Sequence, residues 1–230
     1  MSLVVTPPAP IVVPVADGRS FPVHRVYCVG RNYVEHAVEM GHTGREPPFF
    51  FLKPADAVLP VPEGQTGAMA YPSLTANLHH EIELVVAIGR GGRDIAPADA
   101  TQHVWGYAIG LDMTRRDLQN DMKKQGRPWC IGKAFEQSAP IGPIHPIGRT
   151  GRLVKGAITL DVNGQRRQKG DLSELIWSVD EIIAHLSTAW LLQPGDLIYT
   201  GTPAGVGAVQ RGDLMEGRID GLGALRVTVQ

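Results

Sequence analysis

Cysteine, long apolar runs and an excess of one charge are all scarce in this 230-residue chain. Its two cysteines, Cys28 and Cys130, cannot build a disulfide framework, which favours a reducing compartment. No apolar run approaches the roughly 20 residues that a membrane-spanning helix needs. Lys and Arg total 22 against 23 Asp and Glu, so the chain lacks the basic field that attracts nucleic acid or membranes. The first residues also lack the basic start and apolar core of a signal peptide. We therefore expect a cytoplasmic protein with neither nucleic-acid nor membrane partners.

Glycine and proline are plentiful instead, with 27 Gly and 18 Pro spread along the whole chain. This spread is typical of many short strands joined by turns. A hairpin is predicted over residues 11–24, with its turn at Asp17-Gly18, and a second hairpin turn is predicted at Asn163-Gly164. Further strands are predicted at 25–29, 49–52, 82–88, 104–111, 157–162, 197–200 and 224–229.

Three segments show a capping residue followed three positions later by an acid, which predicts the start of a helix. The pairs are Asn32 and Glu35, Thr114 and Asp117, and Ser178 and Glu181. The corresponding helices are expected at 33–40, at about 115–125, and from 179 to the Gln193-Pro194-Gly195 break. Strands outnumber helices, and neither an internal repeat nor a convincing domain boundary is found. The sequence therefore predicts a mixed α+β, β-rich single domain.

Glu81 and Glu83 open the most apolar strand-like run of the chain. Side chains two apart on a strand point the same way, so both carboxylates leave one face while Ile82 and Leu84 leave the other. Two like charges held this close destabilise each other unless a proton or a cation lies between them. Mg²⁺ or Mn²⁺ is the natural occupant of such an all-oxygen site. The alternative is a solvated strand end with two exposed acids.

Asp112, which ends the strand at 104–111, could complete a three-carboxylate site or simply be a turn residue before the helix. On that helix Arg116 and Gln119 lie three apart and share a face, so they could present a cation and an amide to an anionic ligand. Lys133 lies in an apolar stretch, where it either turns outward to solvent or is held by a carboxylate. Cys130, without an adjacent basic partner, is expected in the core.

His36 and Glu39 form a second candidate pair, three residues apart on the first predicted helix. A carboxylate that orients a histidine makes it a competent general base, although exposed pairs at this spacing are common. His79 and His80, beside Glu81, are either metal ligands or residues that cap the strand entry.

The glycine-rich run at 200–207 lacks the lysine of a phosphate loop and does not lead into a helix. We interpret it as a loop whose backbone N–H groups and Thr202 hydroxyl meet a carboxylate.

Six segments of the chain form one ordered set. They are Val-Gly-Arg-Asn-Tyr-Val-Glu-His-Ala-Val-Glu (29–39), Phe-Leu-Lys-Pro (51–54), His-Glu-Ile-Glu-Leu (80–84), Leu-Asp-Met-Thr-Arg-Arg-Asp-Leu-Gln (111–119), Gly-Lys-Ala-Phe (132–135) and Thr-Gly-Thr-Pro-Ala-Gly-Val-Gly (200–207). Taken together, they resemble the fumarylacetoacetate hydrolase family, in its small single-domain branch. They occur in the order of the family, and the likeness covers residues 25–227. Six ordered motifs are far more specific than any one of them.

The resemblance implies a β-roll with a few short helices, in which residues 1–24 form an N-terminal hairpin extension and 25–230 the catalytic domain. It also implies a homodimer, with Mg²⁺ or Mn²⁺ held by Glu81, Glu83 and Asp112. The larger two-domain members supply a further metal-binding carboxylate that has no counterpart in this chain, so water or substrate is expected in that position.

The reaction that the resemblance implies is hydrolysis of a carbon–carbon bond in a 2,4-diketo acid, most of all fumarylpyruvate, as in gentisate-type aromatic breakdown. His36 and Glu39 would be the general-base pair, carried on a lid that orders over bound substrate. Lys133 would assist catalysis. The residues expected to bind the substrate are Arg116, Gln119, Thr202 and Lys53. A distal carboxylate would need its own cation, for which Arg31, Lys53 and Arg127 are the candidates.

Three other functions remain open from the sequence. Oxaloacetate decarboxylation or 2-oxo-enoate isomerisation would use the same fold and metal without the water-activating pair. A non-haem iron oxygenase would use His79 or His80 with a carboxylate, but adjacent strand residues point to opposite faces. A non-catalytic carboxylate-binding module is the third, and it would leave His36 and Glu39 unexplained.

Overall fold

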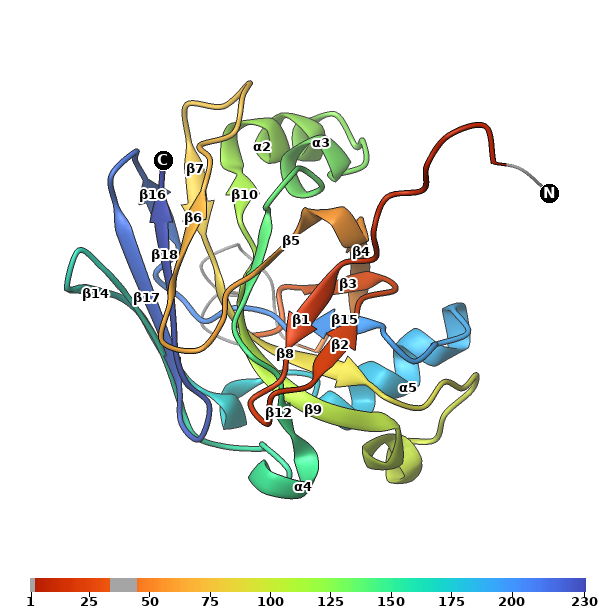
Figure 1. Ribbon diagram of the computed structural model, residues 1–230. Coiled ribbons are helices and arrows are strands. Elements are labelled where there is room, and N and C mark those ends of the chain that lie inside the picture. The colour runs from red at the N-terminus through yellow and green to blue at the C-terminus, as the bar shows by residue number, and fades with distance from the viewer. Residues whose placement is uncertain (1–2, 34–44) are drawn as a thin grey trace.

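A computed structural model describes residues 3–33 and 45–230 (Figure 1). Its largest sheet has eight strands, seven of them in one hydrogen-bonded order. In that order they are β4 (Phe49–Lys53), β3 (Val26–Gly30), β15 (Leu197–Tyr199), β8 (Ile82–Ile88), β9 (Val104–Leu111), β11 (Ala139–Ile141) and β5 (Val58–Pro60), with β12 (His145–Pro146) beside β9.

Three smaller sheets complete the β-structure of the described residues. The five-stranded sheet runs β14 (Gln165–Asp171), β13 (Ala157–Val162), β17 (Leu214–Ile219), β18 (Gly223–Val229) and β6 (Thr66–Met69). The three-stranded sheet runs β10 (Thr114–Arg115), β7 (Leu78–His80) and β16 (Gly207–Val209), and β1 (Val12–Pro14) pairs with β2 (Ser20–Pro22).

The helices are few and short, and they lie at the margins of the sheets (Figure 1). They are α2 (Arg116–Lys124), α3 (Cys130–Lys133), α4 (Ile147–Thr150) and α5 (Val179–Ala189), with 3₁₀ turns at Ala55–Ala57, Pro97–His103 and Leu172–Glu174. Among the described residues, none of these helices combines the length and the apolar character that crossing a membrane requires.

Strand β8 lies between two hydrophobic core clusters. Its side chains point alternately to either face, so successive residues pack into different clusters. Ile82 and Leu84 pack with the apolar residues of the five-stranded sheet, whereas Val85 belongs to the cluster beneath the β1–β2 hairpin. A Cβ added to Gly217 would lie 2.3 Å from Ile82 Cδ1, so glycine allows the two sheets to approach at this point. Glu83 therefore leaves the face of β8 that carries Val85, as the alternation predicts.

The predicted strands are all present, and the mixed, strand-rich fold class is confirmed. Eight strands were not predicted. Seven of them, including β7, β10 and β16, have two to four residues, which carry too little alternation to be recognised, and the eighth is the six-residue β17. The hairpin at 11–24 is confirmed, and Phe21 packs into the second core cluster.

The predicted helices have different outcomes. The Ser178–Glu181 capping box is confirmed at the start of α5. Helix α2 is confirmed, but its predicted box is wrong, because the Thr114 hydroxyl donates to Glu81 and the Asp117 carboxylate accepts from Thr75. The helix expected at 33–40 lies outside the described residues from position 34 onward. Cys130, expected in the core, is exposed on α3.

Candidate active site

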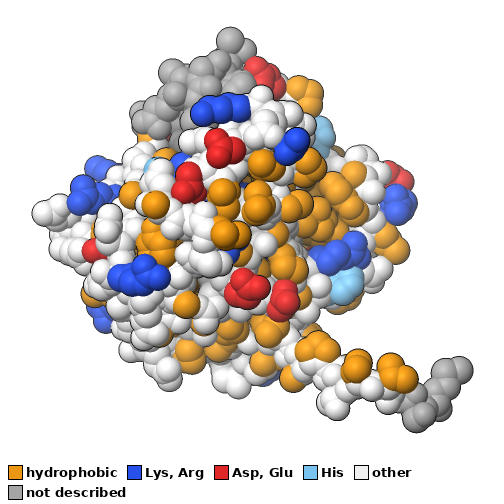
Figure 2. All heavy atoms as spheres, turned by 90° about the horizontal axis from the view of Figure 1, so that it is seen from above, with side chains coloured by type: hydrophobic (Ala, Val, Ile, Leu, Met, Phe, Trp, Pro, Cys, Tyr) orange, Lys and Arg blue, Asp and Glu red, His pale blue; other side chains and the backbone are white. Residues whose placement is uncertain are grey.

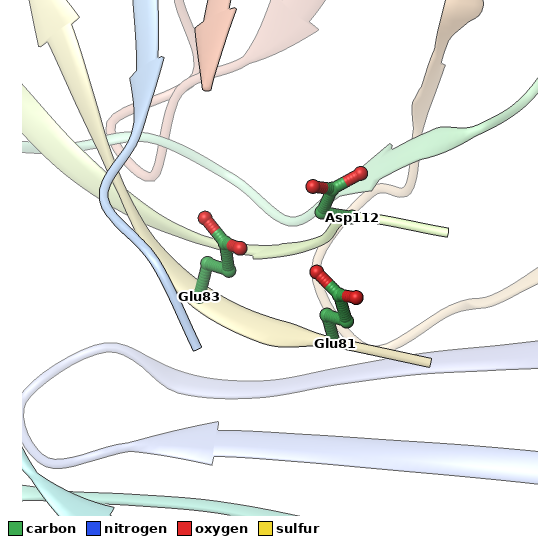
Figure 3. Close-up of side chains that lie close together, drawn as sticks. All are labelled: Glu81, Glu83 and Asp112. Atoms are coloured by element: carbon green, nitrogen blue, oxygen red, sulfur yellow. The ribbon is translucent and has the colours of Figure 1, made fainter. Parts of the chain in front are cut away.

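Three carboxylates from two neighbouring strands meet in one place. Glu81 directly precedes β8 and Glu83 is its second residue, while Asp112 directly follows β9, which pairs with β8 in antiparallel register. The Asp112 backbone N–H donates to the Glu81 carbonyl at 2.8 Å, and this hydrogen bond holds the two backbone segments side by side. One carboxylate oxygen from each residue lies within 4.8 Å of the others, and all three side chains are buried. Figure 3 shows the carboxylates converging on a common space.

Basic side chains surround two of these carboxylates. The Lys133 ammonium lies 2.9 Å from Glu81 Oε2 and 2.7 Å from Asp112 Oδ2, and Arg116 also pairs with Glu81. The sequence left open whether Lys133 turns outward to solvent or is held by a carboxylate. The structure shows that carboxylates hold it. Since Lys133 is only 2% exposed, these ion pairs also compensate for the burial of its charge.

Glu83 has a different environment. The backbone N–H of Gly201 donates to its Oε2 at 2.8 Å, which confirms that the 200–207 loop meets a carboxylate. Burial, and after it the repulsion of Asp112 and Glu81, raises the pKa of Glu83 well above its ordinary value. Burial lowers the pKa of Lys133, but the attraction of Asp112 and Glu81 outweighs it and the net pKa is raised. Glu83 is therefore the member of the trio whose charge is least compensated.

A divalent cation fits this donor set. The site offers three buried carboxylates, and hard ions such as Mg²⁺ and Mn²⁺ prefer oxygen ligands. A positive ion would offset the mutual repulsion that raises the pKa of Glu83. Within the described part of the chain, no histidine nitrogen belongs to this group of ligands, which argues against the iron-oxygenase reading.

Metal binding is expected to strengthen as the pH rises. A carboxyl whose folded-state pKa is raised stabilises the metal-free fold at low pH, and this contribution is lost as the pH rises through the folded-state pKa. The metal takes the place of that proton, so the increase in Tm that Mn²⁺ gives over EDTA should be larger at about pH 8 than at about pH 5. Thermal unfolding at several pH values measures this increment.

The comparison is Glu83→Gln, which lacks this carboxyl and should lose the Mn²⁺ increment in Tm at both pH values. An increment in the original protein that does not vary with pH would contradict the assignment of Glu83 to the metal.

Arg116 and Gln119 share a face of α2, as their spacing predicts. Arg116 Nη1 donates to Gln119 Oε1 at 2.5 Å, and Arg116 Nε donates to His79 Nδ1 at 3.3 Å. Burial, and next the charge of Arg116, lowers the pKa of His79 to about 4, so its ring is neutral at pH 7. Its Nε2–H donates to Asn77 at 2.9 Å. His79 therefore orients Arg116 and does not join the carboxylates.

Gln168 is a buried residue of the site that the sequence did not indicate. It comes from β14 in the five-stranded sheet, and its Oε1 accepts from the Ile82 backbone N–H at 3.1 Å and from His80 Nδ1 at 2.9 Å. Its Nε2 donates to the Thr202 hydroxyl at 2.8 Å, and that hydroxyl donates to the Ile82 carbonyl at 2.7 Å. The Thr202 hydroxyl thus meets a backbone carbonyl where a carboxylate was predicted. Gln168 links the strand of the glutamates to the 200–207 loop.

Lys53, which the resemblance predicts as a substrate ligand, lies behind the carboxylates and does not line the pocket. Its side chain is fully buried, and its ammonium is 2.9 Å from Asp112 Oδ1. It also donates to the carbonyls of Met113 and Lys133. These three partners fix Lys53 behind Asp112, so the structure gives it the task of holding that carboxylate.

A pocket opens onto the carboxylates. Apart from Val29, its other lining side chains are basic, amide, hydroxyl and aromatic groups, which suits a small anionic ligand. The lining residues are Val29, Gly30, Arg31, Phe51, Glu81, Glu83, Asp112, Arg116, Gln119, Trp129, Lys133 and Thr202. Arg31 has a φ of 58°, a left-handed conformation that is uncommon for a residue with a side chain.

His36 and Glu39 lie outside the described residues, so their prediction is neither confirmed nor contradicted. Described residues on both sides of this segment contact the same residue, Trp177. The Asn32 carboxamide accepts from the Trp177 N–H at 2.8 Å and donates to the Trp177 carbonyl at 2.9 Å. The Trp177 indole donates to the Glu46 carbonyl at 3.2 Å, and the Arg45 guanidinium lies 4.6 Å from its ring. Trp177 therefore contacts the chain on both sides of the candidate base pair.

Comparison with known proteins agrees with this site. Residues 25–230 match the family model for the fumarylacetoacetate hydrolase C-terminal region. A fumarylpyruvate hydrolase of Ralstonia sp is 49% identical over 185 residues, covering 80% of this chain and 93% of that protein. A mitochondrial oxaloacetate tautomerase of Rattus norvegicus is 43% identical over 205 residues, covering 89% and 91%.

Among solved structures, the fumarylpyruvate hydrolase of Pseudomonas aeruginosa, in complex with Mn²⁺ and pyruvate, is 58% identical with a TM-score of 0.97. The superposition covers 99% of each chain. A family match over nearly the whole chain, together with the converging carboxylates, shows that this protein belongs to the fumarylacetoacetate hydrolase family.

Proposed function

We propose that this chain is a metal-dependent hydrolase that cleaves fumarylpyruvate to fumarate and pyruvate. The observation that carries the proposal is the buried trio of Glu81, Glu83 and Asp112, with Lys133 bridging two of its members. The trio lies in a chain that is similar over nearly its full length to a hydrolase seen with Mn²⁺ and pyruvate. Both similar hydrolases bear the name of this substrate.

The reaction adds one water molecule and breaks one carbon–carbon bond. Water adds to the C4 carbonyl, the C3–C4 bond breaks, and its electron pair remains on C3 as the pyruvate enolate. A proton then binds to C3, and the products are pyruvate and fumarate. A divalent ion held by Glu81, Glu83 and Asp112 would polarise the 2-keto group and lower the energy of the developing enolate.

The side chains of the protein have separate tasks in this scheme. Arg116 and Gln119 would bind the pyruvoyl carboxylate, because both line the pocket and present donors beside the carboxylate trio. The Lys133 ammonium, within 3 Å of two carboxylates, would donate to a developing oxyanion. His36, backed by Glu39, would take the proton of the attacking water. We assign Lys53 to the positioning of Asp112 and Thr202 to the pocket wall.

Oxaloacetate chemistry is the second candidate, because the relative that is 43% identical is an oxaloacetate tautomerase. Oxaloacetate shares the carboxylate and 2-keto group that the carboxylate trio and Arg116 would recognise. Its tautomerisation or decarboxylation involves no attack by water, so the reaction would not need His36 as a general base.

Hydrolysis of purified fumarylpyruvate, followed by loss of ultraviolet absorbance, tests the proposal. We expect kcat/KM for fumarylpyruvate to exceed that for acetylpyruvate by at least about tenfold, or about 1.4 kcal/mol, because a buried distal carboxylate must be paired. EDTA should stop the release of pyruvate, and Mg²⁺ or Mn²⁺ should restore it. Turnover of oxaloacetate alone would favour the second candidate.

Two finer points belong to this proposal. A homodimer and a cytoplasmic location stay predictions from the resemblance and the composition. Light scattering of the eluted protein measures the first of these, with a mass near twice the 24.8 kDa of one chain as the expected result.

A further inference from the structure

A second hollow lies beside the carboxylate pocket. It runs between the edge strand β4 and the turn that joins α2 to α3. Three residues, Phe51, Trp129 and Lys133, line both hollows, so the second one adjoins the site of reaction. Its lining residues are Phe49, Phe50, Phe51, Leu52, Arg127, Pro128, Trp129, Cys130 and Lys133, and we call it the aromatic groove.

Aromatic side chains form much of the wall of the aromatic groove. Phe49 packs edge-on against Trp129, with centroids 5.3 Å apart, and Phe51 lies 6.0 Å from the same ring. Figure 2 looks down on the side of the molecule that carries α2 and α3 and shows hydrophobic side chains gathered over part of that face. Flat apolar walls suit a planar, conjugated chain of carbon atoms, which buries its faces against them.

One cation in the aromatic groove has no partner within the described part of the chain. Lys133 is bound to Glu81 and Asp112, and no hydrogen bond, ion pair or ring contact involves the guanidinium of Arg127. Of the other candidates for a distal carboxylate, Lys53 is buried behind Asp112. Arg31 lines the pocket of the carboxylates and has its own interactions.

We propose that the acyl arm of the substrate lies in the aromatic groove and that Arg127 pairs with its terminal carboxylate. The inference rests on the proposed function and names the part of the site that selects the acyl group. With the pyruvoyl end at the carboxylate trio, an unsaturated arm passes Phe51 and Trp129 and brings its far carboxylate towards the α2–α3 turn. Arg127 is then a specificity residue that recognises acylpyruvates ending in an acid.

The test compares two substrates in the variant Arg127→Met, which keeps an apolar stem and removes the charge. We expect kcat/KM for fumarylpyruvate to fall at least about tenfold, with little change for acetylpyruvate, which has no terminal carboxylate. Lys124→Met is the matched control, because Lys124 is an exposed cation of α2 outside the lining of the groove. Calorimetry of fumarate binding to the Mn²⁺-loaded protein gives a second readout, in which affinity should fall in Arg127→Met alone.

The outcomes are distinct. An equal loss for both substrates in Arg127→Met, or no loss for either, would overturn the pairing of Arg127 with the carboxylate. Unchanged fumarate affinity would overturn it as well. If the original protein hydrolyses neither substrate, the proposed function fails, and the fumarate titration still decides whether Arg127 binds a dicarboxylate.

Discussion

Glu83→Gln is expected to abolish divalent-ion binding and, with it, hydrolysis. The substitution keeps the volume and can still accept the Gly201 N–H, but it removes one of the three carboxylates that meet there among the described residues. Loss of a residue that only hydrogen-bonds to a metal ligand already weakens metal affinity by about 10–100-fold. Loss of a ligand itself should therefore weaken it by more than that. Calorimetry with Mn²⁺ measures the affinity, and the pyruvate assay measures turnover.

Glu81→Ala should have the same effect on metal binding but a larger effect on the fold. Glu81 pairs with Arg116 and Lys133, and removal of one member of a buried ion pair typically costs about 3–5 kcal/mol. The control is Glu63→Gln, which changes an exposed glutamate that does not line the pocket. Mn²⁺ affinity that is unchanged in both Glu81→Ala and Glu83→Gln would disprove the metal assignment.

His36→Ala is expected to slow hydrolysis of fumarylpyruvate by about 10²–10⁴-fold, the usual contribution of a positioned general base. Metal affinity should be retained, because the carboxylate trio supplies the ligands without histidine. Glu39→Gln should change the rate in the same direction, since it removes the charge that would stabilise the protonated ring. Steady-state kinetics with a parallel Mn²⁺ titration separates the two effects.

Any turnover of oxaloacetate serves as the internal comparison for His36. It involves no attack by water and should respond less than hydrolysis does. His42→Ala is the matched variant, because the sequence gives that histidine no carboxylate partner. Equal losses of both reactions in His36→Ala would mean that the histidine binds substrate or supports the fold.

Features of the site that depend on neighbours in sequence could be predicted. Glu81 and Glu83 share a face because strand side chains alternate, and Arg116 and Gln119 share a face because a helix turns once in about 3.6 residues. For Asp112 the sequence left a third carboxylate and a turn residue both open, and the family resemblance implied the former. The same local rules gave the long strands and the Ser178 cap of α5.

Features that depend on packing between distant segments could not be predicted. The resemblance predicts Lys53 as a substrate ligand, whereas the pairing of β4 with β3 buries its ammonium behind Asp112. The predicted cap at Thr114 failed because Glu81 lies close enough to accept its hydroxyl. Gln168 carries no sequence signal, since a lone glutamine on a strand is ordinary and its partners come from other elements.

The sequence by itself therefore determined the shared face of Glu81 and Glu83, the Arg116–Gln119 pair and the strand-rich class, because each follows from local backbone patterns, whereas the meeting of Asp112 with the glutamates depends on the pairing of β8 with β9. The tertiary structure alone decided which cation meets which anion, and it placed Arg127, but neither Lys53 nor Arg31, in the lining of the aromatic groove. The physical reason is the range of the forces involved. Side-chain alternation acts within one element, whereas burial and ion pairing depend on which elements pack together.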